Sequence, residues 1–215
     1  METINENILF ASLNLPTPNR GDWLDWVKSV DNSLWRVDTF RNSSALALMT
    51  SGGVGTAEDI QAQNFLGNDY SWTPWTCKSI IDYFDAYIFP WLGTRTRVLI
   101  LKTPSKSRNH EHVDCSPREF GSKQHKLRIV ISGNTSSLYF LTKMGNINIP
   151  ETDKPFLMEG SWPHGMINNT WQTKYTICVG TPWRGSKIYP EFEKIMLKSD
   201  YTPVDFENRF FSPKY

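Results

Sequence analysis

The spacing of apolar residues along the 215-residue chain changes near residue 93. Before that point they recur at helical spacing. One stripe lies behind Asp22, a candidate cap, and another ends near Pro90, because proline cannot donate to a continuing helix. The stripes are Trp23, Trp26, Val27 and Val30, and then Ile80, Ile81, Phe84, Tyr87 and Ile88. A further helix is expected at residues 56–63, after a glycine-rich turn at 51–55. The pattern therefore predicts a mostly helical segment over residues 1–92.

Beyond residue 93, short β-rich runs alternate with glycine, asparagine, serine and proline, which is typical of a barrel or sandwich. The runs cover residues 95–102, 110–114, 126–132, 137–142, 156–158 and 174–179. Residues 189–198 predict one more helix before an aromatic-rich tail. We expect a single domain of the α+β class, mainly β with flanking helices. Its β core would span 93–184, packed by the N-terminal helices, with a C-terminal helix and tail over 185–215.

Charge and cysteine content narrow the class of partner. The formal net charge is +1 and no long block of one sign occurs, so neither a nucleic acid nor an anionic membrane is expected as the main partner. Cys77, Cys115 and Cys178 are scattered and form no CxxC pair. The acidic, polar start does not resemble a secretory signal, and the apolar stretches are too short or too interrupted to cross a bilayer. We therefore expect a soluble protein of the reducing cytoplasm.

His112, Asp114 and His164 form a candidate metal site. Residues two apart on a strand point to the same face, so His112 and Asp114 would both point into the barrel. His164 follows much later, in a turn that leads into a new apolar run, and is the natural third ligand. Two histidines and one carboxylate are the usual ligands of non-heme Fe(II), and they leave coordination positions open.

A second ligand set remains open, because His110 alternates with His112 on the same predicted strand face. His110, His112 and His164 would then resemble a cupin-like metal site. A cupin places a glutamate shortly beyond its second histidine, whereas Glu119 lies seven residues beyond His112 here, which favours Asp114 as the carboxylate. For His125 we expect a structural or surface role.

Four segments, residues 112–114, 126–131, 160–164 and 168–177, together resemble the Fe(II)/2-oxoglutarate-dependent oxygenase superfamily. Within it, residues 95–183 are most similar to the branch of aspartyl/asparaginyl β-hydroxylases and proline hydroxylases. The resemblance implies a double-stranded β-helix core, which is the jelly-roll of cupin-like proteins. It also implies Fe(II) as the metal, with 2-oxoglutarate and O2 as co-substrates.

The same resemblance suggests which residues bind 2-oxoglutarate. The family anchors the remote carboxylate with an arginine about ten residues beyond the distal histidine, where this chain has Lys174. Lysine keeps the charge but lacks the planar two-donor fork of arginine. Lys126 and Arg128 match the segment that follows the first ligand strand, and Arg128 or Arg97 would supply a bidentate contact instead. Asn168 would orient the metal ligand or the co-substrate, or form a turn.

The expected activity is hydroxylation of an unactivated carbon, with release of CO2 and succinate. The resemblance favours an amino acid, or a side chain within a peptide or protein, as substrate. Two alternatives remain: a cupin-type metalloenzyme that uses His110 without 2-oxoglutarate, and a non-catalytic jelly-roll that binds a sugar, peptide or protein. Residues 52–55, 116–124 and 201–215 are candidates for a lid by composition.

Overall fold

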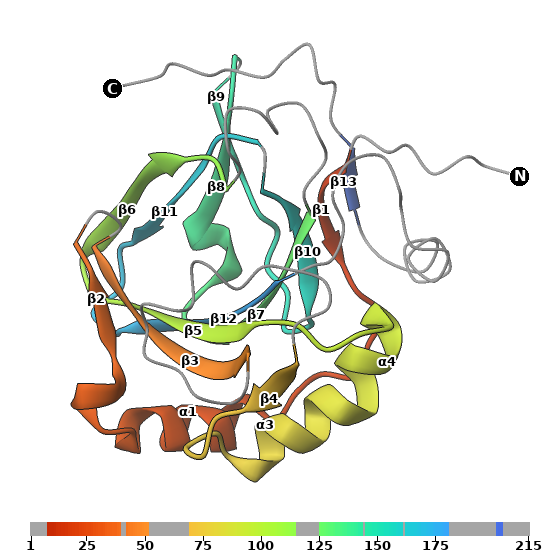
Figure 1. Ribbon diagram of the computed structural model, residues 1–215. Coiled ribbons are helices and arrows are strands. Elements are labelled where there is room, and N and C mark those ends of the chain that lie inside the picture. Colours follow the sequence, from red (N-terminus) through yellow and green to blue (C-terminus); the bar gives the residue numbers. More distant parts are fainter. Residues whose placement is uncertain are drawn as a thin grey trace, which may run out of the picture.

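The computed structural model describes residues 8–39, 42–51, 69–114, 125–143, 145–160, 162–180 and 201–203. Within these residues the strands form two antiparallel sheets (Figure 1). The larger sheet has the order β13-β1-β10-β7-β12-β5-β3-β2, with β4 paired to β3, and the smaller has the order β6-β11-β8-β9. The bounds are β1 (Ile8–Ser12), β2 (Arg36–Asp38), β3 (Ser43–Ser51), β4 (Tyr70–Trp72), β5 (Val98–Thr103), β6 (Ser107–His112), β7 (His125–Ser132), β8 (Leu138–Thr142), β9 (Gly145–Asn148), β10 (Phe156–Glu159), β11 (His164–Asn168), β12 (Lys174–Val179) and β13 (Tyr201–Pro203).

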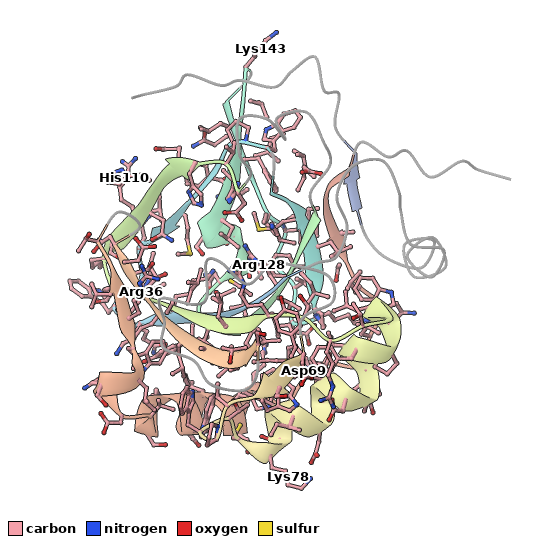
Figure 2. All side chains as sticks on the ribbon, in the orientation of Figure 1. Arg36, Asp69, Lys78, His110, Arg128 and Lys143 are labelled. Carbon is pink, nitrogen blue, oxygen red and sulfur yellow. The ribbon has the colours of Figure 1, made fainter. Side chains whose placement is uncertain are left out.

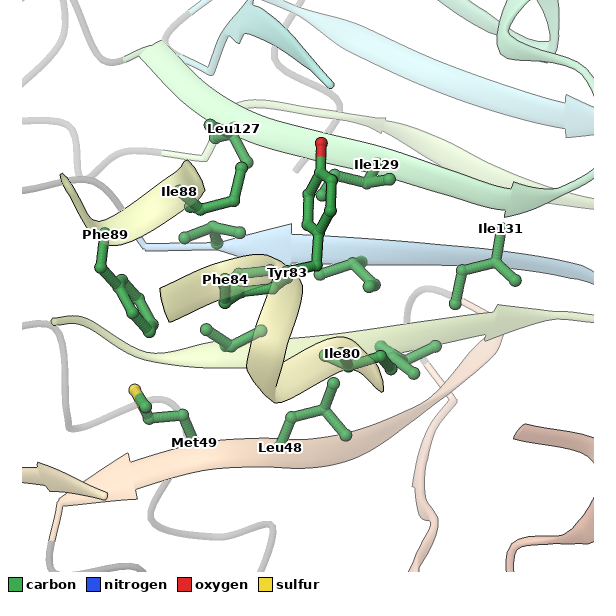
Figure 3. Packing of buried hydrophobic residues seen from close by; sticks show 14 of the residues in the cluster. Leu48, Met49, Ile80, Tyr83, Phe84, Ile88, Phe89, Leu127, Ile129 and Ile131 are labelled. Atoms are coloured by element: carbon green, nitrogen blue, oxygen red, sulfur yellow. The ribbon is translucent and has the colours of Figure 1, made fainter. Parts of the chain in front are cut away.

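Helices cover the outer face of the larger sheet (Figure 1). They are α1 (Arg20–Ser29), α3 (Lys78–Tyr83), the π-helix η2 (Phe84–Ile88) and α4 (Phe89–Leu92), with short 3-10 turns η1 (Asn32–Leu34) and η4 (Thr135–Ser137). The main core lies between these helices and the sheet, where Phe84 and Ile80 pack against Leu48 and Ile129 (Figure 3). Burying each such side chain stabilises the fold by about 1.5 to 3 kcal/mol. This layer holds the larger sheet in place.

Helix α1 confirms the predicted buried face but begins differently. Trp23 and Val27 are buried as expected. The cap is Asn19 rather than Asp22: the Asn19 side chain accepts from the Asp22 backbone N–H at 3.5 Å and donates to the Asp22 carboxylate at 2.6 Å. Asp22 therefore lies in the first turn, where its negative charge interacts favourably with the positive end of the helix dipole.

The second helix continues past Pro90, which the sequence predicted as its end. The π-helical turn η2 precedes the proline, and Pro90 lies in the first turn of α4, where its missing N–H costs no hydrogen bond. The helix ends at Gly93, which has φ +73°. Its N–H donates to the Phe89 carbonyl at 2.8 Å.

The first 92 residues are mixed in their described part, not mostly helical. They contribute β1, β2, β3 and β4 as well as the helices. Strand β3 is buried on both faces, with Leu46 and Leu48 toward the helices and Ala47 packed beside Leu99. A strand buried on both sides shows no apolar alternation, which is why the sequence pattern missed it.

The expected α+β fold with a double-stranded β-helix core is confirmed. The predicted β runs appear as β5, β6, β7, β8, β10 and β12, with some ends shifted by one to three residues. The larger sheet also takes in β1 and β3, from outside residues 93–184. No helix in the described ranges is long and apolar enough to span a bilayer. The helices expected at 56–63 and 189–198, and the lid candidates apart from β13, lie outside the described residues.

Alternation along β12 divides its side chains between two environments. Tyr175, Ile177 and Val179 join the core under the helices. Lys174 and Cys178 therefore face the other way, toward the smaller sheet. The inner face of this strand thus carries a lysine among otherwise small or apolar side chains.

Candidate metal centre

His112, Asp114 and His164 come together inside the barrel, with one potential ligand atom from each lying within 4.8 Å of the others. The His112 Nε2 is 3.5 Å from one oxygen of Asp114, and the His164 Nε2 is 3.9 Å from the other. The two imidazole rings are 4.5 Å apart between centroids. Two nitrogens and one carboxylate so placed match the donor set of a non-heme Fe(II) site in chemistry and number.

A β-bulge decides which histidines meet. Strand β6 pairs with β11 so that His112 lies opposite His164 and Asn109 lies opposite Met166, which leaves one extra residue on β6. Because of this extra residue, His110 does not share the inner face with His112. Its side chain is exposed and points away from the barrel (Figure 2). The cupin-like set with His110 is therefore not assembled.

Asp114 does not lie on the strand, as the sequence pattern predicted, because β6 ends at His112. Asp114 is in the bend that follows, where its backbone N–H donates to the Gly160 carbonyl at 2.7 Å. The end of β10 therefore holds this carboxylate beside the two histidines.

Each imidazole is oriented by a backbone carbonyl. The Nδ1 of His112 is 2.8 Å from the His110 carbonyl, and the Nδ1 of His164 is 2.8 Å from the Trp162 carbonyl. Since a carbonyl only accepts, both Nδ1 atoms carry the proton and each Nε2 presents a lone pair to the centre. This is the arrangement that metal-binding histidines usually have.

The charges of the cluster favour an anionic carboxylate and neutral imidazole at His164. Burial lowers the pKa of His164 to about 4, helped by His112. For Asp114, burial alone would raise the pKa, but the neighbouring side chains of His112, His164 and Arg128 hold that pKa well below its usual range. Both groups are therefore in the protonation state that binds a metal at neutral pH.

Arg128, on the inner face of β7, contacts Asp114 directly. Its Nη2 lies 3.2 Å from the Asp114 carboxylate, and Figure 2 shows it between the two sheets. Arg97 is close enough for its charge to interact with Arg128 and Asp114, and burial lowers the pKa of Arg97. The structure thus places both arginines beside the candidate metal centre. Lys126, two residues before Arg128, is half-buried and lies opposite Met158 of β10.

Lys174 lies on the same face of the sheet, toward the opposite end of the barrel. Its side chain is 1% exposed, and the Nζ donates to the Asn134 carbonyl and the Ser137 hydroxyl. Burial lowers the pKa of Lys174 to about 8. Lys174 is four residues before Cys178, which lies opposite Arg128, so the backbone positions of Lys174 and Arg128 are about 13 Å apart along the sheet.

Asn168 forms a turn, and the expectation that it contacts the co-substrate is not supported. Its Nδ2 lies 2.9 Å from the Pro104 carbonyl and 2.8 Å from the Gln172 carbonyl. Its Oδ1 accepts from the backbone and hydroxyl of Thr170. With both amide hydrogens used, Asn168 connects the β11–β12 loop to the loop after β5.

Sequence reasoning missed two supporting groups. Gly165, next to His164, allows Tyr139 to pass close by, because a Cβ there would lie 2.6 Å from the Tyr139 hydroxyl. That hydroxyl donates to Glu111 at 2.7 Å, which helps to fix the bulged part of β6. A glycine within a strand is a sequence signal for such a close approach. The second group consists of Asn134 and Ser137, which bind the Lys174 ammonium. No pattern in the sequence indicated that they would lie there.

Comparison with known proteins shows that this chain shares its fold with solved structures, although its sequence is very different from theirs. The sequence matches no family model and no curated protein. The fold is similar to that of a Trichoplax adhaerens prolyl hydroxylase, solved with a peptide fragment of the hypoxia inducible factor oxygen degradation domain. The identity is 13%, the TM-score is 0.51, and 91% of this chain and 87% of that chain are covered. A Pseudomonas putida prolyl-4-hydroxylase has 11% identity, TM-score 0.48 and coverage of 82% and 94%. OsALKBH1 has 9% identity, TM-score 0.48 and coverage of 81% and 97%.

Proposed function

We propose that this protein is an Fe(II)- and 2-oxoglutarate-dependent dioxygenase that hydroxylates an unactivated carbon. The observation that carries the proposal is the convergence of His112, Asp114 and His164 within 4.8 Å inside a jelly-roll barrel. The orientation of both imidazoles by carbonyls supports it, because it leaves each Nε2 free for a metal. The shared fold with a prolyl hydroxylase adds support at the level of architecture.

In this proposal the chain fixes geometry and the metal supplies the oxygen chemistry. Fe(II), when bound, would activate O2 and accept the keto and adjacent carboxylate oxygens of 2-oxoglutarate. His112 and His164 would hold the metal through Nε2, and Asp114 would hold it through its carboxylate. Arg128 orients that carboxylate from 3.2 Å away. Arg97 adds a second positive charge at the same end of the barrel.

The Lys174 ammonium would bind the remote carboxylate of 2-oxoglutarate. An ammonium has three donors, and two of them contact neutral oxygens, of Asn134 and Ser137. No carboxylate of the described residues contacts it directly, so an incoming anion would form the first such pair. Lys126 is the less favoured anchor because it is only half-buried.

We propose an amino acid, or a side chain within a peptide or protein, as the substrate. The prolyl hydroxylase with the similar fold was solved with a peptide fragment, and this supports a substrate of that kind. The balanced net charge of +1 supports a partner other than nucleic acid. We also propose a cytoplasmic location, because the scattered cysteines suit a reducing compartment.

An anaerobic titration tests the proposal. Metal-free protein is mixed with Fe(II) and then with 2-oxoglutarate, and the visible charge-transfer band of a chelated keto acid is recorded. We expect a band in the wild type and none in Asp114→Ala or His164→Ala. Iron binding without a band would favour a cupin-type enzyme that does not use 2-oxoglutarate. Folded protein that binds no metal would refute the dioxygenase and favour a jelly-roll binding protein.

A further inference from the structure

The buried ammonium of Lys174 is held by a short segment that a single carboxylate organises. Glu151 accepts four hydrogen bonds from the two residues that open the turn η4. One oxygen accepts from the Thr135 backbone N–H at 3.0 Å and the Thr135 hydroxyl at 2.9 Å. The other accepts from the Ser136 backbone N–H at 3.1 Å and from the Ser136 hydroxyl. The residues on either side of this pair, Asn134 and Ser137, are the two partners of Lys174.

Further bonds fix the same segment to residues 148–152. The single proton of the Thr135 hydroxyl is shared between Glu151 and the Pro150 carbonyl, which lies 2.8 Å away, and the Asn148 amide donates to the Ser136 carbonyl at 2.6 Å. Within the segment, the Ser137 hydroxyl donates to the Asn134 carbonyl at 2.7 Å. The positions of both oxygens that face Lys174 therefore depend on the turn that Glu151 completes.

Close packing limits the lysine from the other side. Gly133 has φ +86°, and a Cβ at that position would lie 3.1 Å from the Lys174 Cγ. The lysine stem thus lies against a glycine that no larger residue can replace without displacement. Its ammonium has one preferred position, set by Gly133 beneath the stem and by Asn134 and Ser137 at the tip.

We infer that Glu151 is a positioning residue for the Lys174 ammonium, and that through the η4 turn it sets the site's preference for a keto acid with a second, remote carboxylate. This inference rests on the proposed use of 2-oxoglutarate. Glu151 does not touch the co-substrate in this scheme. It holds the two oxygens that direct the ammonium, and its negative charge favours the charged form of the lysine.

The electrostatics agree with this role. Burial lowers the pKa of Lys174, and the negative charge of Glu151 opposes that shift. The neighbouring strands β5 and β7 present Thr103 and Ser132 near Lys174, and neither titrates. Burial alone would raise the pKa of Glu151, but the bonds from Ser136 and Thr135 outweigh burial and lower it. Glu151 therefore stays anionic throughout the range in which Lys174 titrates.

Glu151→Gln is the direct test, with Asp153→Asn as its matched control. Glutamine loses the charge and cannot accept at its amide nitrogen, so it cannot reproduce the four bonds. Asp153 and Glu151 line one surface pocket, and Asp153 accepts a hydrogen bond from the Thr17 hydroxyl at 3.4 Å. The first readout is the pKa of Lys174, which is measured from the NMR signal of 13C-labelled lysine in metal-free protein. We expect a decrease of about one unit in Glu151→Gln and none in Asp153→Asn.

The second readout is binding of 2-oxoglutarate and of pyruvate to protein loaded with Mn(II). Pyruvate has the keto acid but no remote carboxylate. We expect Glu151→Gln to bind 2-oxoglutarate about tenfold more weakly, with unchanged affinity for pyruvate. As pH rises and the ammonium loses its proton, the affinity for 2-oxoglutarate should decline. This decline should begin at a lower pH in the variant than in the wild type. Equal losses for both ligands, or an unmoved lysine pKa, would overturn the inference.

A separate outcome identifies failure of the proposed function. If wild-type protein binds metal but no 2-oxoglutarate, the dioxygenase proposal fails, while the lysine titration still decides whether Glu151 acts on Lys174. If Glu151→Gln does not fold, Ser136→Ala gives a milder test, because it removes one hydroxyl donor and keeps the charge. A smaller loss of 2-oxoglutarate affinity, again without loss for pyruvate, is then expected. No change in a folded Ser136→Ala would count against the inference.

Discussion

The two ends of the barrel interior carry polar clusters that suit ligands of opposite charge. At one end, His112, Asp114 and His164 present lone pairs and a negative charge to a common point. At the other, Lys174 presents a buried positive charge to neutral oxygens. The first cluster suits a cation and the second suits an anion.

The clusters also differ in how they are held. The histidines are oriented by carbonyls two residues away in the chain, at His110 and Trp162. Lys174 is held by residues 134–137, far away in sequence, and indirectly by Glu151. A locally oriented cluster leaves a readable motif in the sequence, whereas the long-range cluster leaves none. A metal ion at the first cluster and the carboxylate of a bound anion at the second would satisfy both.

The largest expected effect is at the metal end. Asp114→Ala should abolish detectable Fe(II) binding, since it removes one of three ligands. It should also reduce the free energy of unfolding by about 3 kcal/mol, because Arg128 loses its buried partner. Metal titration and urea unfolding measure the two effects. His110→Ala is the control, and its exposed side chain predicts wild-type affinity. A loss of metal in that control would revive the cupin-like ligand set.

Lys174→Met should affect the anion-binding end of the barrel without affecting the metal-binding end. The variant keeps the stem and removes the charge, so binding of 2-oxoglutarate should weaken by about 10- to 100-fold, while Fe(II) affinity stays unchanged. Calorimetry on protein loaded with Mn(II) measures 2-oxoglutarate binding, and anaerobic titration of metal-free protein measures Fe(II) affinity. Lys154→Met changes a half-buried lysine of the neighbouring surface pocket and should leave both affinities unchanged. If Lys174→Met binds 2-oxoglutarate normally, another cation is the anchor.

The pH dependence of stability gives a third test of the lysine end. The folded pKa of Lys174 is about 8, below the usual 10.5, so the unfolded chain binds more protons between these values. The wild type should therefore gain stability relative to Lys174→Met as pH rises from 8 to 10.5, by at most about 1.4 kcal/mol for each pH unit. Over the same range 2-oxoglutarate binding should weaken, because the ammonium is lost. Parallel stability curves for the two proteins would contradict the lowered pKa.

The smallest effect concerns the packing of the lysine stem. Gly133→Ala should cost about 2 kcal/mol, from the positive φ and from the contact at 3.1 Å with Lys174. In a Lys174→Ala background the same substitution should cost about 1 kcal/mol less, because the stem is absent. A double-mutant cycle by urea unfolding measures the difference. Equal costs in the two backgrounds would mean that Gly133 does not confine the lysine.

The sequence predicted much of the β core and the composition of the candidate site. Strand β12 has the predicted bounds, and β7 begins within one residue of its prediction, because both are short β-rich runs bounded by turn-forming residues. Strand β3 was missed, since it is buried on both faces and shows no period. The helix beyond Pro90 was missed because a π turn accommodates the proline, and no local signal announces that turn.

What the sequence determined by itself was the set of chemical groups: two histidines and a carboxylate at a spacing that two strands can bring together, and a lysine on a later strand. Only the tertiary structure decided which of them meet. The bulge in β6 directs His110 outward while His112 faces inward, and the end of β10 holds Asp114 beyond its strand. Glu151 reaches the Lys174 site through a turn. These outcomes depend on pairing and packing between residues distant in sequence, which local patterns do not encode.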